Sequence, residues 1–442
     1  MRPVTACLSL CLLFSHATIS ADADSGDKAT DFVTVRDGKF YLHGETYYYI
    51  GTNYWYGPLL ASPGETGNRE RLAQELDFLA AHGMRNLRIL AGAEGPDDQP
   101  FRVTPGLQQS PGKYDEELLT GLDYLLAEMG KRDMQAVLYV NNTWEWSGGY
   151  AQYLNWTGHG DIPYPLDKGW PAFMKYAGQF HESPECIEAF FNHVRFMLGR
   201  TNQITGVKYV DDPTIMAWQI ANEPRAVSAE HIPAFEKWMK EACALFKSLD
   251  SNHLLSTGNE GEHGCEGRVD LYERLHADPH VDYCTMHIWP KNWQWLDVEN
   301  IPGSLESCIE QTNDYIDKHC AVARSLGKPI VIEEYGFPRE GHSYDLASAT
   351  TSRDKYYGNI FAQVVKNRAD GGPLAGCNFW TFGGTGRPSP GDPFWSKGED
   401  ILGDPPQEEQ GLNSVFDVDT TVKVVDKYNR ELGAIAEPAA SR

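Results

Sequence analysis

Residues 215–224 read Ile-Met-Ala-Trp-Gln-Ile-Ala-Asn-Glu-Pro, a largely apolar run that ends in a carboxylate. Residues 329–335, Pro-Ile-Val-Ile-Glu-Glu-Tyr, repeat this pattern. Apolar runs without polar alternation are typical of strands that are buried on both faces, as in parallel sheets. The two stretches therefore predict a parallel sheet in which two strands end in a glutamate.

Six further apolar runs extend this sheet to eight predicted strands. The eight predicted strands cover residues 47–51, 86–90, 136–140, 215–221, 254–257, 283–287, 329–333 and 376–381. Apolar residues at helical spacing predict helices over 68–81, 116–129, 171–180, 184–199, 232–249, 304–326 and 353–366. Eight strands, most of them followed by a helix, are the count of a (β/α)8 TIM barrel. We predict an α/β fold with one such barrel and long loops at its C-terminal face.

The ends of the chain differ from the barrel. Residues 1–21 combine Arg2 with a short apolar stretch and small residues, which predicts a secretory signal peptide and a secreted, extracellular or periplasmic protein. Residues 22–31 are polar, and we expect them to be disordered. Asp37-Gly38 predicts a hairpin at 32–42. The barrel domain is expected over 32–436, because no low-complexity linker interrupts it.

Composition excludes several partners. The 442 residues carry 38 Lys and Arg against 62 Asp and Glu, a formal net charge of −24, which repels nucleic-acid backbones. No apolar run reaches the roughly 20 residues that a membrane span needs. The chain has 12 Trp, and such side chains often stack on the flat faces of neutral ligands. We therefore expect no nucleic acid and no membrane as a partner.

Seven cysteines follow residue 21, and an exported protein would permit disulfides between them. Cys308 with Cys320 and Cys243 with Cys265 are candidate pairs. The cysteine spacings match no zinc motif, and the histidines show no HExxH pattern. We therefore expect no metal.

The candidate catalytic residues are two glutamates at the ends of predicted strands. Glu223 follows the fourth strand and Glu334 the seventh, and active sites of this fold lie at the C-terminal ends of strands. Each glutamate could simply pair with an arginine or a lysine. Two carboxylates in the barrel mouth, in surroundings rich in tryptophan, instead favour glycoside hydrolysis, in which one protonates the leaving oxygen and the other attacks the sugar.

Several segments, in order, resemble glycoside hydrolase family 5, and within it the β-mannanase branch. The two signatures are Asn222-Glu223-Pro224 and Glu334-Tyr335-Gly336. The other similar segments are 51–57 (Gly-Thr-Asn-Tyr-Trp-Tyr-Gly), 86–88, 141–149 (Asn-Asn-Thr-Trp-Glu-Trp-Ser-Gly-Gly), 287–293, 334–339, 378–380 and 411–417. The resemblance covers nearly the whole chain after residue 21.

The resemblance implies a role for each reacting residue. Glu223 would be the general acid/base and Glu334 the nucleophile, while Glu333 would point away. Arg88 would keep the nucleophile ionised through its positive charge. In an apolar setting lined by tryptophan, Glu223 would have a raised pKa, as a general acid needs. A retaining mechanism would place the two carboxyl groups about 5–5.5 Å apart.

The resemblance also implies residues that contact the substrate. Asn222 would bind the 2-hydroxyl, His287 would lie near the acid/base, and Trp380 would floor the subsite of the distorted sugar. Trp289 stands where many members have a tyrosine, and Asn142 lies where some have a histidine after the third strand. The predicted stacking residues at strand ends are Trp55 and Trp144.

We predict a secreted, retaining endo-β-1,4-mannanase that acts on mannan, glucomannan or galactomannan. Its partners would be β-mannan or manno-oligosaccharides, it would need no cofactor, and we expect a monomer. An exo-acting β-mannosidase or mannobiohydrolase stays open, because a loop that blocks one end of the cleft would decide it. A β-1,4-glucanase also stays open. A non-catalytic carbohydrate-binding barrel would require the loss of a carboxylate, and both carboxylates are present.

Overall fold

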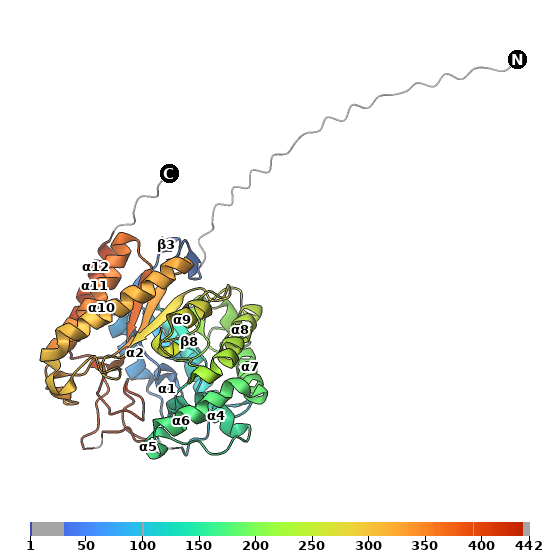
Figure 1. The fold of residues 1–442 in the computed structure, drawn as a ribbon, viewed down its shortest axis with the longest axis horizontal. Helices are drawn as coiled ribbons and strands as arrows, with labels where there is room; N and C mark the ends of the chain where they lie inside the picture. The colour runs from blue at the N-terminus through green and yellow to red at the C-terminus, as the bar shows by residue number, and fades with distance from the viewer. Residues whose placement is uncertain (2–30, 100, 392, 436–442) are drawn as a thin grey trace.

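A parallel eight-stranded sheet forms the centre of the molecule. The computed structural model describes Met1 and residues 31–99, 101–391 and 393–435 (Figure 1). The strand order is β10-β9-β8-β5-β4-β13-β12-β11, and every neighbouring pair is parallel. The strands are β4 (Tyr49–Asn53), β5 (Asn86–Leu90), β8 (Gln135–Tyr139), β9 (Ile215–Gln219), β10 (Leu254–Ser256), β11 (Cys284–Ile288), β12 (Ile330–Tyr335) and β13 (Leu374–Phe379).

The two edge strands, β10 and β11, nearly close this sheet into a barrel. The backbone N–H of Asp282 donates to the Leu255 carbonyl at 2.8 Å, and the N–H of His287 donates to the Glu260 carbonyl at 3.0 Å. Every residue of the eight strands is buried, as expected of strands covered on both faces. The predicted (β/α)8 barrel is confirmed.

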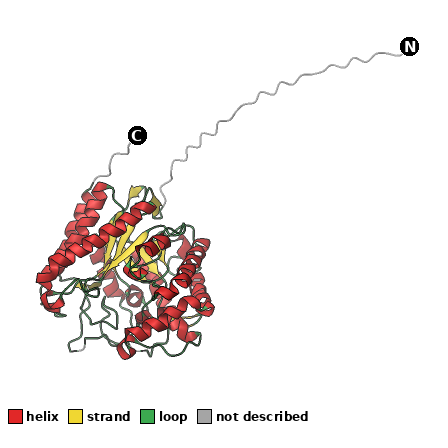
Figure 2. Cartoon of the chain, in the orientation of Figure 1, coloured by secondary structure: helices red, strands yellow, loops and turns green. Residues whose placement is uncertain are grey.

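A helix follows each strand and covers the outside of the barrel (Figure 2). These helices are α2 (Arg69–Ala81), α3 (Glu116–Gly130), α7 (Pro184–Leu198), α8 (Ile232–Leu249), α9 (Val269–His276), α10 (Ile301–Leu326), α11 (Thr351–Asp370) and α12 (Thr421–Ala434). Side chains of Asn68, Asp115 and Ser183 accept hydrogen bonds from the first turns of α2, α3 and α7, which fixes where these helices begin. The sequence did not predict α9, which has only eight residues, or α12.

A small antiparallel sheet covers the N-terminal end of the barrel. It consists of β1 (Thr34–Arg36), β2 (Lys39–Leu42) and β3 (Glu45–Thr46), and it includes the predicted hairpin. Phe40 is fully buried and packs edge-on against Tyr283 with ring centroids 5.3 Å apart. Figure 1 shows β3 at the end of the molecule opposite α5, so the open mouth of the barrel lies on the α5 side.

Two long insertions build the mouth. Between β8 and α7 lie α4 (Gly149–Trp156), α5 (Pro165–Lys168) and α6 (Trp170–Ala177). Between β13 and α12 lie β14 (Phe382–Gly384) and β15 (Val415–Phe416), which are joined by the connection 385–414. The buried carboxylate of Asp404 fixes this connection, because it accepts hydrogen bonds from the backbone N–H groups of Gly411, Asn413 and Ser414 and from the Ser414 hydroxyl.

All seven cysteines after residue 21 are free and buried, so neither candidate disulfide forms. Cys308 and Cys320 both lie on α10, twelve residues apart. At 1.5 Å of rise per residue this places them about 18 Å apart, far beyond the reach of a disulfide. Cys243 is buried in the core face of α8, apart from Cys265.

The predicted signal peptide and most of the predicted polar segment lie outside the described residues. Within the described part of the chain, no helix is both long and apolar enough to cross a membrane.

Candidate active site

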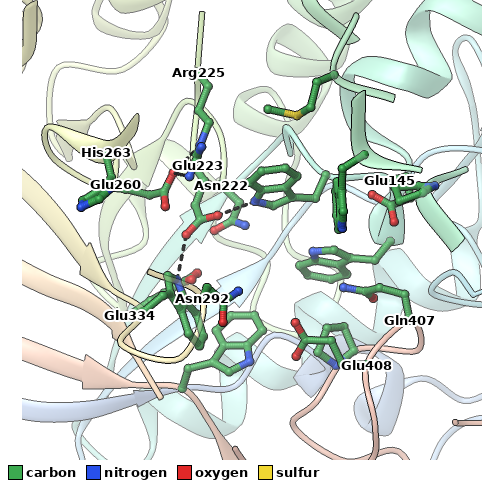
Figure 3. A pocket seen from close by; sticks show the side chains of 18 of the residues that line it. Glu145, Asn222, Glu223, Arg225, Glu260, His263, Asn292, Glu334, Gln407 and Glu408 are labelled. Atoms are coloured by element: carbon green, nitrogen blue, oxygen red, sulfur yellow. Dashed lines mark hydrogen bonds and ion pairs between the residues drawn. The ribbon is translucent and has the colours of Figure 1, made fainter. Parts of the chain in front are cut away.

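A cavity of about 470 Å³ opens at the C-terminal ends of the barrel strands. Glu223, Glu334 and Trp380 lie on its wall, together with residues of both long insertions (Figure 3). The two glutamates come from β9 and β12, which lie on different sides of the barrel. The barrel therefore brings together two carboxylates that are 111 residues apart in the sequence, 334 minus 223.

Glu223 holds an unusual backbone conformation, with φ of +50°. A residue with a side chain pays strain of order 1–3 kcal/mol in such regions, so neighbouring contacts must hold it there. The Thr143 hydroxyl donates to the Glu223 carbonyl at 2.7 Å, and the Glu223 N–H donates to the Gly258 carbonyl at 3.1 Å. The backbone is thus fixed where its carboxylate faces the cavity.

Three ring N–H groups surround the Glu223 carboxylate. His287 Nδ1 lies 2.7 Å from Oε1, Trp289 Nε1 donates to the same oxygen at 3.0 Å, and Trp144 Nε1 donates to Oε2. Burial raises the pKa of Glu223, but the hydrogen bond and charge of His287, with smaller effects of Arg225 and Trp144, outweigh burial and hold it below its ordinary value. The expected raised pKa of Glu223 was therefore wrong, because the surrounding rings donate hydrogen bonds rather than forming an apolar wall.

Glu334 lies at the end of β12 and pairs with a buried arginine. Arg88 Nη1 donates to Glu334 Oε1, and Arg88 is completely buried. The same guanidinium donates to Asn222 Oδ1 at 2.9 Å and to Gln219 Oε1 at 2.8 Å. Burial lowers the pKa of Arg88, but the charges of Glu334 and Glu333 outweigh burial and raise it. Arg88 therefore presents a permanent positive charge to Glu334.

The two carboxylates are close neighbours. One oxygen of Glu223, one of Glu334 and a ring nitrogen of His287 all lie within 4.8 Å of one another. Burial lowers the pKa of His287, but Glu334 and hydrogen bonds to the surrounding glutamates outweigh burial and raise it well above 6.5.

The other predicted substrate residues fall into two groups. Asn222, Trp144, Trp289 and Trp380 line the cavity. Asn142 and Trp55 do not. Asn142 lies behind the wall and accepts a hydrogen bond from Asn222 Nδ2 at 3.2 Å, so it orients Asn222.

Trp55 differs most from the expectation that it stacks on a sugar. It is 2% exposed, and its indole N–H donates to the carbonyl of Gly403 in the connection 385–414. Trp146 packs against it with ring centroids 5.4 Å apart. Trp55 therefore supports the wall from behind, because an insertion that the sequence pattern did not place covers it.

At one end of the cavity lie three acceptors that the sequence analysis missed: Glu145, Gln407 and Glu408 (Figure 3). Glu145 Oε2, Gln407 Oε1 and Glu408 Oε2 are buried atoms without a hydrogen-bond partner among the described residues. Burial raises the pKa of Glu145 to about 7 and that of Glu408 to about 8. Carboxyls that titrate near neutrality can both donate and accept, as sugar hydroxyls require. The segment 141–149 could have indicated Glu145, but no pattern marks Glu408.

The opposite end carries the positive charge of the cavity. Arg225 pairs with the buried Glu260 and lies over the Trp144 ring at 5.1 Å. Burial raises the pKa of Glu260 to about 8, although Arg225 opposes this shift. His263 stacks on Trp293 with ring centroids 3.8 Å apart. This end is therefore aromatic and cationic, whereas the other is rich in acceptors.

Comparison with known proteins gives one consistent match. A sequence model described as GH family 5 beta-mannosidase-like matches residues 30–437. Mannan endo-1,4-beta-mannosidase 1 of Oryza sativa subsp. japonica is 31% identical over 395 residues, which cover 85% of this chain and 83% of that protein. These matches extend over the whole barrel and both insertions.

Solved structures agree with this match. The crystal structure of a glycoside hydrolase family 5 mannosidase from Rhizomucor miehei superposes with a TM-score of 0.83 at 36% identity, covering 91% of this chain and 97% of that one. A mutant form of the same mannosidase, in complex with mannosyl-fructose, gives a TM-score of 0.83 at 35% identity over 91% of this chain and 97% of that one.

Proposed function

The chain belongs to glycoside hydrolase family 5, in its β-mannosidase-like group, and on that premise we propose that it hydrolyses β-1,4-mannosidic bonds with retention of configuration. The observation that carries this proposal is the short separation of Glu223 and Glu334, which have oxygens within 4.8 Å of each other. Retaining enzymes hold their carboxyl groups about 5–5.5 Å apart, whereas inverting enzymes need about 6.5–9.5 Å to admit a water. An approach of two oxygens to within 4.8 Å supports the shorter, retaining separation.

The geometry supports two steps. Glu334, paired with the Arg88 guanidinium, attacks the anomeric carbon while Glu223 passes a proton to the leaving oxygen. Glu223, now a carboxylate, then takes a proton from the water that releases the covalent mannosyl-enzyme. Trp380 lies on the cavity wall with Glu334, where the ring of the attacked sugar would stack.

The proposed mannan preference follows from the names of the relatives, and the proposed location follows from the N-terminal sequence. The rice relative is called a mannan endo-1,4-beta-mannosidase, and the solved relative of 36% identity is called a mannosidase. We propose export because residues 1–21 carry the signal-peptide pattern described above. Detection of a mature chain that begins near residue 22 in the culture medium would test it.

Product analysis tests both the activity and its mode. An endo-acting enzyme releases a ladder of manno-oligosaccharides from unbranched mannan and lowers its viscosity early in the reaction. We expect activity on mannan to exceed activity on carboxymethyl cellulose, with Glu334→Ala as the blank. Activity on cellulose alone would contradict the mannan proposal, and a well-folded protein inactive on both polymers would contradict the enzyme proposal.

A second candidate mode, release of single mannose units from chain ends, is favoured by the acceptor-rich end of the cavity. The attacked sugar lies over Glu334, and Glu334 is among the charges that raise the pKa of Glu408. Glu408, Gln407 and Glu145 line one side of the cavity (Figure 3), and in the exo mode they would bind the terminal sugar and end the cleft there. Mannose as the sole early product, with unchanged viscosity, would establish this mode.

Substitution of Glu408 distinguishes the exo-acting mode from the endo-acting mode. In the exo mode, Glu408→Ala removes a hydrogen bond to the terminal sugar, and a buried hydroxyl left without its partner costs about 1–3 kcal/mol. We expect kcat/KM for mannotriose to fall about 10–100-fold. Glu409→Ala, on the same connection but outside the cavity wall, should change it little. Equal values for both variants would contradict the exo mode.

A further inference from the structure

Glu333 and Glu334 are consecutive residues, yet both face His287. In a regular strand successive side chains point to opposite faces. The pairing of β11 with β12 is irregular here, since Met286 pairs with Ile332 but His287 pairs with Glu334. Glu333 is thus the extra residue of a bulge, and bulges near active sites re-aim side chains. The bulge places two carboxylates around one imidazole.

Two buried atoms without partners face each other at this bulge. His287 Nε2 and Glu333 Oε2 have no hydrogen bond to any described residue, and they lie 3.9 Å apart. Both side chains are nearly or fully buried, with 0% of His287 and 1% of Glu333 exposed. The other oxygen of Glu333 is bound by Gln219 Nε2 and, at 3.2 Å, by the Tyr283 hydroxyl. Glu333 is therefore anchored below the cavity, with its free oxygen towards the ring.

We propose that Glu333 is a positioning residue that acts through His287: its carboxylate, placed by the bulge behind Nε2, keeps the ring protonated, so that the His287–Glu223 pair stores the proton used in catalysis. This inference rests on the proposed retaining mechanism. A general acid must carry a proton, but the hydrogen bonds to Glu223 favour its ionised form. A proton held on His287 would supply the one that Glu223 lacks.

The proton balance is simple. In the free enzyme the proton lies on Nδ1 of His287, 2.7 Å from Glu223 Oε1. When a substrate binds, this proton moves to Glu223 and then to the leaving oxygen, which leaves a neutral ring and a carboxylate. In the second step Glu223 takes a proton from water, and the proton returns to Nδ1. Glu333 gains and loses nothing.

Other charges around the ring do not replace Glu333. Glu223 and Glu334 share Nδ1, at 2.7 and 3.3 Å, and so face the opposite nitrogen. Further ionisable groups near this site are Arg88 from β5, Arg225 after β9, Glu260 after β10, Tyr49 on β4, Tyr139 on β8 and Tyr283 beside β11. Among the carboxylates of the described residues, Glu333 is the one within ion-pair distance of Nε2.

Glu333→Gln tests this proposal, since the amide can still accept from Gln219 and Tyr283 but carries no charge. The alkaline limb of the pH profile of kcat/KM reports the essential acid of the free enzyme. A nearby anion favours the protonated pair, so its removal lowers the pKa of the pair. We expect the alkaline limb to move down by about one pH unit or more. The kcat at the optimum should change much less than in Glu334→Gln.

A second readout is the titration of the His287 ring, followed by NMR of the full-length protein labelled with ¹⁵N in histidine. We expect the ring to lose its proton at lower pH in Glu333→Gln. Tyr283→Phe is the matched control, because it removes a hydroxyl that hydrogen-bonds the Glu333 carboxylate but keeps the charge of that carboxylate. The alkaline limb of the pH profile of this variant should stay near that of the unmodified protein. Should Glu333→Gln not fold, Glu333→Asp, which draws the charge away from Nε2, should give a smaller shift in the same direction.

The outcomes separate the two proposals. An unmoved limb together with an unmoved ring titration would overturn the role of Glu333 while leaving retaining hydrolysis intact. Absence of hydrolysis by the unmodified protein would remove the proposed function, and the ring titration would still decide whether Glu333 holds the proton on His287.

Discussion

Glu334→Gln is expected to abolish hydrolysis, with kcat falling by roughly 10⁴–10⁶-fold, as when other covalent nucleophiles are removed. The amide has nearly the same shape, but it cannot attack the anomeric carbon, and its neutral group leaves the buried Arg88 without its anion. The measurement is kcat and KM on manno-oligosaccharides at the pH optimum. KM should change far less than kcat, because the change removes chemistry rather than binding.

Covalent labelling identifies the nucleophile directly. A 2-fluoro-mannosyl fluoride should accumulate as a mannosyl-enzyme, and mass spectrometry should place it on the peptide that contains Glu334. Glu94→Gln is the control, since Glu94 is buried outside the cavity and its acceptor role towards the Gly149 N–H can be kept by an amide. Label on Glu333 instead, or full activity of Glu334→Gln, would contradict the assignment of the nucleophile.

The barrel could be predicted because its strands carry a strong local signal. Strands such as Ile215–Gln219 and Ile330–Tyr335 are buried on both faces, and this leaves continuous apolar runs that need no tertiary information to detect. Helix α9 was not predicted because it has only eight residues, about two turns, which is too short for a clear helical period. The two glutamates proposed as catalytic could be predicted because they lie at or just after the ends of such runs.

The acceptor-rich end of the cavity could not be predicted, because its residues follow no apolar run. Glu408 belongs to a connection without regular structure, and Asp404 holds that connection in place through backbone N–H groups that any residue type could supply. Trp55 follows a predicted strand and looked like a sugar platform, but whether it meets substrate depends on Gly403, more than 340 residues away. Contacts between residues so far apart in the chain leave no periodic pattern in the local sequence.

The predicted direction of the Glu223 pKa shift was wrong for a third reason. Tryptophan in a sequence indicates apolar surface, but in the folded site His287 and the indole N–H groups of Trp144 and Trp289 hydrogen-bond the carboxylate, and His287 contributes most to the lowered pKa. The direction of a pKa shift depends on which edge of a ring faces the group. That orientation follows from the tertiary structure.

Glu223→Ala is expected to separate the two steps of the reaction. Substrates that need a proton on the leaving oxygen, such as mannobiose, should lose about 10²–10⁴-fold in kcat/KM, the usual contribution of a general acid. A dinitrophenyl β-mannoside leaves without a proton, so its kcat/KM should fall much less, and release of the mannosyl-enzyme should become limiting because the base is missing. Rates on mannobiose and on the aryl mannoside, measured side by side, give the test.

Azide should then restore turnover of the aryl mannoside in Glu223→Ala, because a small anion can enter the space of the lost carboxylate and attack the mannosyl-enzyme without base assistance. The product should be β-mannosyl azide, since two inversions at the same carbon retain its configuration. Glu334→Gln, which forms no mannosyl-enzyme, should not respond to azide. An α-mannosyl azide would contradict retention, and an equal loss on both substrates would show that Glu223 does not protonate the leaving group. If the proton is stored on the His287–Glu223 pair, the alkaline limb of the profile on aryl mannoside should also disappear in Glu223→Ala, because no proton is then delivered to the leaving oxygen.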